Sequence, residues 1–451
     1  MSVEALPEPV RQRLGSATRA VIWSAFLLRC GQSAATVIIG FYLESLRRGG
    51  VRLGFDIGPQ HFGAAIVASL LLSSSYFWEL LVAPIMGALS DRYGRKPFII
   101  LGPLIGLIGI QVYPLSGILG VLFLARALEG VSAATLTPAT LGFLADTTAG
   151  TNEARGRTMA YYEIAVLVGI GSGYALGGFM WQALGIHAFR SAGGLYLLSI
   201  LVVWVWVSHT WQIRHTERIG LADYLSVMRQ PRVLRFAPAW LCVTAVIGLW
   251  FNNVVFQLAG PRRAGQLLTG GMTGGQVSLI MGMFVLVLIV GTFGWSRLFG
   301  RFRFKTTIMF IALCGMFVVC LDLLVLNHRG NDSIWWFAGL LPILGISIAV
   351  ESGFTPAALA YLADITEDFK ADRGVIMGLY SIILSVGAVT GGVAGGPFAQ
   401  AWGLDGMIFL TLMLAVAAMV TMVLLQRADA LHRLASPTQP KITPESSPAP
   451  A

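Results

Sequence analysis

The sequence predicts an all-α integral membrane protein whose twelve transmembrane helices form two pseudo-symmetric six-helix bundles. Composition is the first reason. Of 451 residues, 56% are hydrophobic and 12% are charged, whereas a soluble domain carries about 25% charged residues, and the mean hydropathy is +0.74. The second reason is that twelve apolar runs are long enough to cross a hydrocarbon core of about 30 Å. The third is an internal repeat that relates the two halves of the chain.

The twelve apolar runs alternate with polar connections, as expected for helices that cross a membrane one after another. Their approximate bounds are 20–46, 64–89, 98–115, 117–144, 158–184, 192–211, 236–258, 277–298, 306–326, 334–362, 375–401 and 407–425. The longest inner connection follows the sixth run and separates two sets of six.

The distribution of basic residues predicts the orientation in the membrane. With a cytoplasmic N-terminus, the inner segments hold 22 Lys and Arg residues and the outer loops hold 7. Basic residues concentrate on the cytoplasmic side, so we expect both termini inside the cell and the protein in the plasma or inner membrane. The net charge of +9 then needs no nucleic-acid partner. The expected parts are a cytoplasmic tail (1–19), a first bundle (20–211), a cytoplasmic linker (212–235), a second bundle (236–425) and a cytoplasmic tail with a disordered end (426–451).

An internal repeat links the fourth and fifth runs to the tenth and eleventh. Residues 137–146 read TPATLGFLAD, and residues 355–364, 218 positions later, read TPAALAYLAD. The same offset places Arg155-Gly156 opposite a second Arg-Gly pair at 373–374. Chance similarity between apolar segments does not explain a matched proline, aspartate and Arg-Gly pair. The two halves are therefore expected to share one six-helix architecture.

A charged turn at residues 87–97, GALSDRYGRKP, separates the second and third runs. Charges at the bilayer centre are costly, so this turn lies at a membrane surface, which the charge distribution makes the cytoplasmic one. Its pattern G-x-L-S-D-R-x-G-R-K resembles the loop between helices 2 and 3 of the major facilitator superfamily. The resemblance implies that family's twelve-helix fold and solute transport by alternating access.

The resemblance also makes this turn an inner gate. Asp91 is expected to cap the N-terminal end of a neighbouring helix and to pair with a base, and Arg95 to join that network, with Arg155-Gly156 and Glu163 as candidate partners. A turn that only sets topology is the alternative. The matching segment 295–303 carries an arginine where the acid aligns, so the gate is one-sided. The residues assigned to the gate are Gly87, Asp91, Arg92, Gly94, Arg95 and Arg155.

Arg126 and Glu129 in the fourth run are three positions apart, so they are able to pair on one helix face. Ionisable groups inside apolar runs are functional candidates, because an unpaired charge in a membrane is costly. The segment from Arg126 to Gly130 resembles the R-x-x-x-G motif of proton-coupled facilitators, in which the arginine takes part in proton transfer. A carboxylate in an apolar site holds its proton until a cation approaches, and Glu129 and Glu79 are the candidate acids. The alternative is a permanent ion pair that only holds helices together.

The first run carries Arg29 and Gln32 at its polar positions. A cation in the substrate path favours an anionic or zwitterionic substrate, unless Glu79 neutralises it. Trp250 is a candidate for the substrate cavity, and an anchor at the outer interface is the alternative for this tryptophan. The polar and aromatic side chains expected to line the cavity are Trp250, Asn252, Asn253 and Tyr380.

Three further acids lie in the apolar runs. We expect Glu351 to be a coupling acid of the second half. Asp322 and Glu163 lie near the ends of their runs, and we assign them to packing or helix capping.

Glycines recur at small-x-x-x-small spacing in the fifth and eleventh runs. The fifth-run pattern resembles the motif G-x-x-x-G-P-x-x-G-G of drug–proton exchangers, with Tyr174 in place of the proline. The same spacing suits close helix packing. The ladder therefore indicates either exchange or an architectural feature of both halves. Its members are Gly169, Gly173, Gly177 and Gly178 in the fifth run and Gly387, Gly391 and Gly395 in the eleventh.

These features together predict a secondary active transporter and not an enzyme. The sequence contains no phosphate-binding loop for ATP, so we expect a proton-coupled exporter of an amphiphilic or anionic organic solute, drug or lipid-like compound. An uptake symporter of a small organic solute is the alternative, and a non-transporting membrane enzyme or scaffold is a second class that the scattered histidines do not favour. We expect a monomer with no cofactor, metal or nucleic-acid partner, whose ligands are protons, substrate and lipid.

Overall fold

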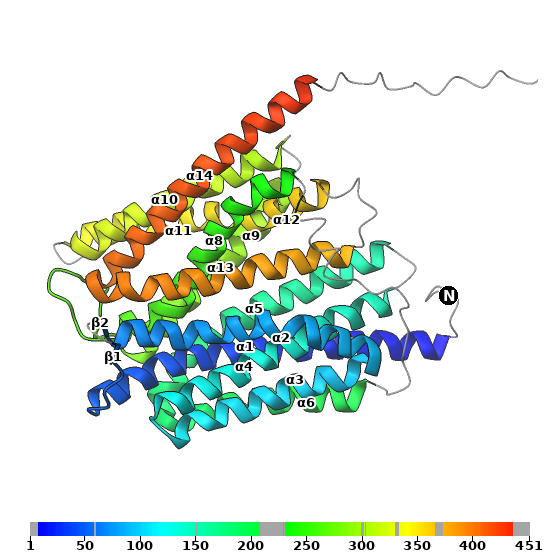
Figure 1. Cartoon of the computed structure of the whole chain (residues 1–451), viewed down its shortest axis with the longest axis horizontal. Coiled ribbons are helices and arrows are strands. Elements are labelled where there is room, and N and C mark those ends of the chain that lie inside the picture. The colour runs from blue at the N-terminus through cyan, green and yellow to red at the C-terminus, as the bar shows by residue number, and fades with distance from the viewer. Residues whose placement is uncertain are drawn as a thin grey trace, which may run out of the picture.

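A computed structural model describes residues 8–57, 60–148, 152–207, 229, 231–298, 302, 304–329, 333–365 and 373–435. Within these residues the chain forms long helices and one short two-stranded hairpin (Figure 1). In the first half the elements are α1 (Glu8–Arg48), β1 (Phe55–Ile57), β2 (Gln60–Phe62), α2 (Ala64–Tyr93), α3 (Arg95–Val112), η2 (Tyr113–Leu115), α4 (Leu119–Thr147), α5 (Asn152–Leu184), η3 (Gly185–His187) and α6 (Ala188–Trp206). In the second half they are α8 (Pro231–Ala259), α9 (Gly274–Leu298), α10 (Lys305–Arg329), α11 (Ile334–Glu351), α12 (Phe354–Ile365), α13 (Arg373–Trp402) and α14 (Leu404–Ala435).

The predicted fold class is confirmed. The described helices contain eleven segments long and apolar enough to cross a membrane, and one of these, Arg157–Trp206, has 50 residues. That length is about two crossings at 1.5 Å per residue. The segment contains α5, the short helix η3 and α6, with Gly185 in the left-handed region (φ 55°) at the junction. Counting α5 and α6 separately therefore gives the twelve predicted crossings.

Two local features differ from the sequence-based expectation. The connection between the first and second runs contains an antiparallel hairpin, in which Phe55 pairs with Phe62. The tenth run is not one helix, because α11 ends at Glu351 and α12 begins at Phe354. Hydropathy detects neither feature, since it reports only how long an apolar run is.

The helices run between two faces. The N-terminal end of α1 and the C-terminal end of α14 lie at one end of the bundle, which we call the terminal face (Figure 1). The β1–β2 hairpin lies at the other end, which we call the hairpin face. Alternate connections lie at each face, so the α2–α3 turn is at the terminal face and η2 is at the hairpin face.

The internal repeat is visible in the helix packing. In the first half, α1 packs against α5 and α6, and α4 packs against α2 and α3. In the second half, α8 packs against α13 and α14, and α11 packs against α9 and α10. Each pair of the first set has its counterpart in the second, so the halves are pseudo-symmetric as predicted. The domain boundary at 212–235 stays a prediction, because most of that segment lies outside the described residues.

The two halves meet mainly through α2 against α13 and through α5 against α9. Their hydrogen bonds cluster toward the hairpin face. On one side of the interface, the Ser69 hydroxyl donates to the Gly392 carbonyl and Asn252 Nδ2 donates to Ser73 Oγ at 3.2 Å. On the other side, the Gly178 amide donates to Ser278 Oγ at 2.9 Å.

Toward the terminal face, α2 presents large apolar side chains that the protein does not cover. Phe77, Leu81 and Ile85 are 50%, 55% and 57% exposed. Tyr161, near the terminal end of α5, is also exposed. The structure therefore holds its halves together at the hairpin face and leaves these side chains of α2 and α5 uncovered toward the terminal face.

The glycine ladders bring α5 close to α1 in the first half and α13 close to α8 in the second, and Gly178 abuts α9 of the other half. A Cβ added at Gly173 would lie 2.7 Å from the Ser33 Cβ and 2.9 Å from the Ala34 amide nitrogen of α1. In the second half, Gly387 and Gly391 abut Thr244 and Ala245 of α8 in the same way. The ladder is thus an architectural feature of both halves, as one of the two interpretations predicts.

Tyr174 occupies the place of the proline in the exchanger-like motif. It is buried, and its ring lies 5.1 Å from the ring of Phe251 on α8. The departure from the motif therefore adds an aromatic contact between the two halves.

We predict that Gly173→Ala lowers thermal stability. The added methyl group has no room against α1, and overpacking of this kind costs about 1–3 kcal/mol. Unfolding of the purified protein in detergent, followed by tryptophan fluorescence, measures the effect. Gly194→Ala in α6 is the matched control, because no atom lies within 4 Å of its added Cβ. Equal melting temperatures for the two variants would contradict the packing role.

Candidate functional site

Arg126 of α4 is buried inside the first half, where a charge must be fully paired. Its Nη1 lies 2.5 Å from Glu129 Oε2, so the pair expected from the i, i+3 spacing is present. Its Nε and Nη2 donate to the main-chain carbonyl of Leu72 on α2, at 3.3 Å and 3.2 Å. One guanidinium therefore binds a carboxylate of its own helix and the backbone of a neighbouring helix.

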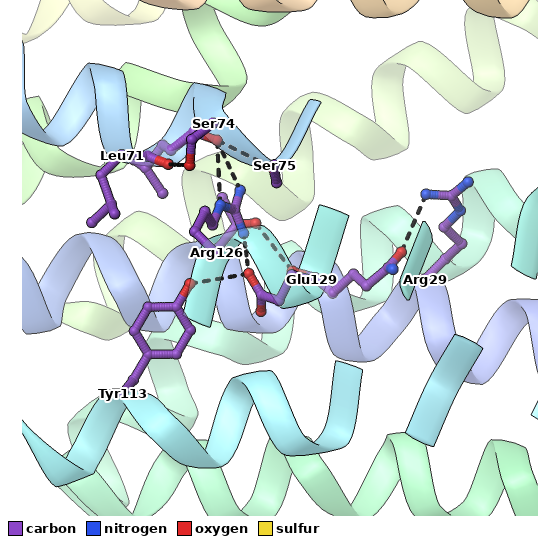
Figure 2. A network of polar contacts seen from close by, with 10 residues as sticks. Arg29, Leu71, Ser74, Ser75, Tyr113, Arg126 and Glu129 are labelled. Carbon is purple, nitrogen blue, oxygen red and sulfur yellow. Dashed lines mark hydrogen bonds and ion pairs between the residues drawn. The ribbon is translucent and has the colours of Figure 1, made fainter. Parts of the chain in front are cut away.

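Glu129 is also buried and has a second partner. The hydroxyl of Tyr113, the first residue of η2, donates to Glu129 Oε2 at 3.1 Å. Figure 2 shows the carboxylate between the Tyr113 phenol and the Arg126 guanidinium. Both bonds use the same carboxylate oxygen, and Glu129 Oε1 has no hydrogen-bond partner. The sequence analysis missed Tyr113, because it lies outside any motif and on another helix.

The turn of α2 that receives Arg126 also takes part in the contact between the halves. The Leu72 carbonyl accepts from Arg126, and the next residue, Ser73, accepts from Asn252 of α8. A change in the Arg126–Glu129 pair therefore acts on a backbone segment that touches the second half. Neither Leu72 nor Ser73 was a candidate, since a main-chain acceptor and a serine in an apolar run carry no sequence signal.

Arg29 of α1 forms a separate polar group. Its Nη1 donates to Gln32 Oε1 at 3.2 Å, and its Nη2 donates to Thr137 Oγ1 of α4 at 3.4 Å. Glu79 and Glu163 interact with Arg29 electrostatically. The two acids considered for proton coupling thus interact with different cations. Glu129 forms an ion pair with Arg126, and Glu79 interacts electrostatically with Arg29. Glu79 therefore lies near Arg29 but forms no direct ion pair with it among the described side chains.

The asparagines of α8, expected to line a cavity, lie at helix contacts in this arrangement, and the cavity role stays a prediction. Asn252 and Asn253 are 2% and 3% exposed. Asn252 bonds to Ser73, and Asn253 Nδ2 donates to the Gly392 carbonyl of α13 at 3.2 Å. These amides satisfy backbone and hydroxyl groups at helix contacts, where apolar side chains are unable to do so.

The other expected cavity residues lie in different places. The Trp250 indole donates to Thr411 Oγ1 of α14 at 2.9 Å, so it links two helices of the second half and is neither exposed nor a lone interface anchor. Glu351 is half-buried at the end of α11, next to the break before α12. Asp322 is buried in α10, with Oδ2 unpaired. The side chain of Tyr380 lies outside the described residues.

The gate turn at the terminal face forms a charge network among α2, α3 and α4. Asp91 pairs with Arg95. Arg95 also reaches Asp146 at the end of α4, with 3.4 Å between Nε and Oδ2, and donates to Ser90 Oγ at 2.9 Å. Gly94 has φ 97°, which a residue with a side chain rarely adopts, and it lets α3 begin directly after α2.

Arg95 has an acidic partner, Asp146, that was not among those expected. A signal for Asp146 was present, because it is the aspartate that the internal repeat matches at the end of TPATLGFLAD. Glu163 interacts electrostatically with Arg29. The side chain of Arg155 lies outside the described residues, so its place in the network stays a prediction. Arg92 is exposed, and its Cζ lies 5.4 Å from the centroid of the Tyr93 ring. Gly87 packs against Pro138.

The second copy of the turn is only partly described. Arg297, at the position that aligns with Asp91, is exposed at the end of α9, and residues 299–301 and 303 lie outside the described part. In the same region the Trp295 indole donates to the carbonyls of Ala349 and Val350, at 3.1 Å each. The contact between α9 and α11 is therefore neutral here.

Known proteins match this chain both in sequence and in structure. The sequence profile of the Major Facilitator Superfamily matches residues 21–350 and 268–449. The chain is 26% identical over 333 residues to Multidrug resistance protein 1 of Bacillus subtilis (strain 168), covering 70% of this chain and 77% of that protein. It is 24% identical over 386 residues to Quinolone resistance protein NorA of Staphylococcus aureus (strain MRSA252), covering 83% and 87%. A crystal structure of a mutant of the nucleoside transporter NupG matches with a TM-score of 0.69 at 12% identity, covering 91% of this chain and 99% of that one.

We predict that substitutions of Arg126 and Glu129 have strongly non-additive effects on the stability of the protein. Arg126→Met leaves Glu129 as an unpaired buried charge, and breaking a buried pair costs about 3–5 kcal/mol. Removing both charges in Arg126→Met/Glu129→Gln avoids that penalty, so the double variant should melt at a higher temperature than Arg126→Met alone. Thermal unfolding of the four proteins of this double-mutant cycle gives the coupling. Additive effects of the two single substitutions would show that the pair is not energetically linked.

Proposed function

The chain belongs to the Major Facilitator Superfamily and is a membrane transporter, and we propose that it exchanges protons for an amphiphilic or anionic organic solute and exports that solute. The observation that carries this proposal is the buried Arg126–Glu129 pair, joined through Leu72 to the contact between the two halves. Relatives named for multidrug and quinolone resistance support export. We place the transporter in the cell membrane as a monomer, with both termini in the cytoplasm.

Proton binding at Glu129 gives the coupling step. While Glu129 is ionised, Arg126 is held between the carboxylate and the Leu72 carbonyl. A proton on Glu129 removes its negative charge. The buried guanidinium of Arg126 is then stabilised by moving to another anionic or polar partner. Because Arg126 also holds α2, its displacement changes the turn that bonds to Asn252. Protonation and the arrangement of the halves are thus linked.

Alternating access follows from where the halves touch. With both termini in the cytoplasm, the hairpin face is the outer face, and the present arrangement is closed outside. The outward-facing state requires the contacts of Ser69, Ser73 and Ser278 to separate. In that state the terminal face closes, and the Asp91–Arg95–Asp146 network becomes part of the closed surface.

The surroundings of Arg29 favour a substrate that carries an anionic or zwitterionic group. The residue is half-buried, and its hydrogen-bond partners among the described side chains, Gln32, Thr137 and Tyr162, are neutral. Its nearest acids interact with it through space, without a direct ion pair. A substrate carboxylate is able to form the direct pair that Glu79 does not form. The exposed aromatic and aliphatic side chains of α2, such as Phe77, suit the apolar part of such a molecule.

Transport in reconstituted vesicles tests the function. We expect an imposed pH gradient to drive movement of at least one solute from a panel of quinolones, organic cations and organic anions, with protons moving in the opposite direction. Arg126→Ala should abolish the dependence on the gradient, because Glu129 then lacks its switching cation. Arg19→Ala, an arginine near the N-terminal end of α1 that bonds only to the Gly15 carbonyl, is the control.

The outcomes of this experiment are distinct. Proton and solute movement in the same direction would replace exchange by symport. Unchanged gradient dependence in Arg126→Ala would refute the coupling role of this residue. Absence of solute-dependent proton movement across the whole panel would contradict proton-coupled transport.

We further predict that Asp91→Asn slows turnover more than it weakens substrate binding. The substitution removes the charge that pairs with Arg95 but lies at the terminal face, far along α2 from Arg126 and Leu72. Initial transport rates and equilibrium binding of a transported solute, measured on the same preparation, separate the two effects. Asp91→Glu retains the charge and is the matched control. Wild-type transport rates in Asp91→Asn would remove the gate assignment.

A further inference from the structure

A buried carboxylate lies at the hairpin-face end of α1. Glu44 is 2% exposed, and both of its oxygens accept from arginines of the same helix. Arg47 donates to Oε2 at 2.7 Å and to Oε1 at 2.8 Å, and Arg48 Nε donates to Oε1 at 2.7 Å. A buried ion pair is weak evidence of a role in stability, because the cost of removing charges from water offsets their attraction. This cluster therefore needs another explanation.

One arginine of the cluster contacts the other half of the protein. Arg48 Nη2 donates to the main-chain carbonyl of Ala259 at 3.0 Å, and Ala259 is the last residue of α8. The final carbonyls of a helix have no partner within it, and this end of a helix carries a partial negative charge. Two guanidiniums and one carboxylate leave a net positive charge at the end of α1. The two helix ends that meet here are therefore complementary in charge.

The loop that follows α8 supplies partners for the carbonyls on either side of Ala259. The Leu258 carbonyl accepts from the Met272 amide at 3.0 Å, and the Gly260 carbonyl accepts from the Gly271 amide at 2.8 Å. Ala259 itself is 1% exposed, and buried carbonyls are almost always hydrogen-bonded. In this arrangement the side chain that satisfies the end of α8 comes from the first half of the protein.

Apolar side chains pack beside this polar contact. Val37 and Phe41 of α1 belong to one buried cluster with Val255 and Leu258 of α8. The two helices approach closely at Gly40, where an added Cβ would lie 2.6 Å from Val255 Cγ1. Hydrophobic contact is non-directional, whereas a hydrogen bond requires a particular distance and angle. Arg48 therefore adds a directional contact to an otherwise apolar interface.

We propose that Arg48 and the Ala259 carbonyl form a lock that keeps the two halves closed at the hairpin face, and that Glu44 is the positioning residue that holds Arg48 against α8. The proposal rests on the alternating access of the proposed function, in which this face closes and opens. Hydrogen bonds at this face also join α2 to α13 and α5 to α9, and the lock adds the pair α1 and α8. When the halves separate, this bond breaks and its two groups are hydrated instead.

The reactivity of a buried thiol tests the lock in the purified full-length protein. Ser278 is fully buried and bonds to α5 across the interface, so Ser278→Cys places a thiol that a hydrophilic maleimide reaches when the halves separate. The rate of modification at this position, resolved by peptide mass spectrometry, follows the open population. Because α5 and α9 are not the helices of the lock, a local change at the end of α1 does not expose this thiol.

In this background we expect Arg48→Ala to raise the rate of modification. The Arg48 side chain is 61% exposed and its bond competes with water, so the increase should be about two- to fivefold. Arg47→Ala is the matched control. Arg47 forms its ion pair with Glu44 and has no hydrogen bond to the second half among the described residues, so this variant should react at nearly the parent rate. Arg48→Lys, which retains the charge and a donor, should restore much of the closed population.

The role of Glu44 is tested through Arg48. Glu44→Gln should also raise the rate of modification, because a neutral amide holds the guanidinium less firmly than a carboxylate does. If Glu44 acts through Arg48, the double variant Glu44→Gln/Arg48→Ala reacts no faster than Arg48→Ala alone. A merely structural role of Glu44 would instead add to the effect of Arg48→Ala. Where Glu44→Gln does not fold, the comparison of Arg48→Ala with Arg47→Ala decides whether the lock exists.

Equal rates of modification for Arg48→Ala and Arg47→Ala would overturn the lock, and additive effects in the double variant would overturn the positioning role of Glu44. The measurement uses neither a solute nor a proton gradient. A protein that shows the lock but moves no solute would therefore contradict the proposed function and not the lock. A protein that exchanges protons for solute, but whose Arg48→Ala variant reacts at the parent rate, would contradict the lock alone.

Discussion

The buried charge of Arg126 is the constraint on which the first half depends. A guanidinium inside a membrane protein must have all of its charge compensated, and this one obtains that compensation from Glu129 of its own helix and from the backbone of α2. Hydrogen bonds to a main-chain carbonyl do not depend on the identity of the α2 side chain. They therefore join α4 to α2 in a way that persists as long as Arg126 stays next to Glu129.

This connection gives α2 a role that extends along its whole length. The helix begins at the hairpin face, where Ser69 and Ser73 contact the second half, and it ends at the terminal face with Asp91 in the gate network. Arg126 binds it at Leu72, directly next to Ser73. On the proposed function, α2 links Glu129 to both faces, and Pro84 interrupts its backbone hydrogen bonds between Leu72 and Asp91. The proposed proton step, the contacts at the hairpin face and the charge network at the terminal face thus all involve one helix.

The sequence was sufficient for what depends on local pattern. Run length predicted the crossings, the offset of 218 predicted the paired packing, and the i, i+3 spacing predicted the Arg126–Glu129 pair. It was insufficient where the rotation of a helix about its axis decides the contact. Helices that are apolar on all sides do not show by periodicity which face meets which neighbour. For this reason neither the bond from Asn252 to Ser73 nor the place of Asp146 beside Arg95 was predicted.

The two halves share a fold, but the charged pair of the first half has no charged counterpart in the second. At the offset of 218, Arg126 and Glu129 correspond to Leu344 and Ser347 of α11, which carry no charge. The equivalent helix pair, α9 and α11, is joined instead by the neutral indole of Trp295. Symmetric packing lets the halves exchange between two arrangements of similar energy, but a proton shifts that balance only if it binds one half more strongly in one arrangement. On the proposed function, the charged pair of the first half and the neutral contact of the second supply that asymmetry, so the divergence of the repeat is what lets proton binding shift a symmetric fold between its two arrangements.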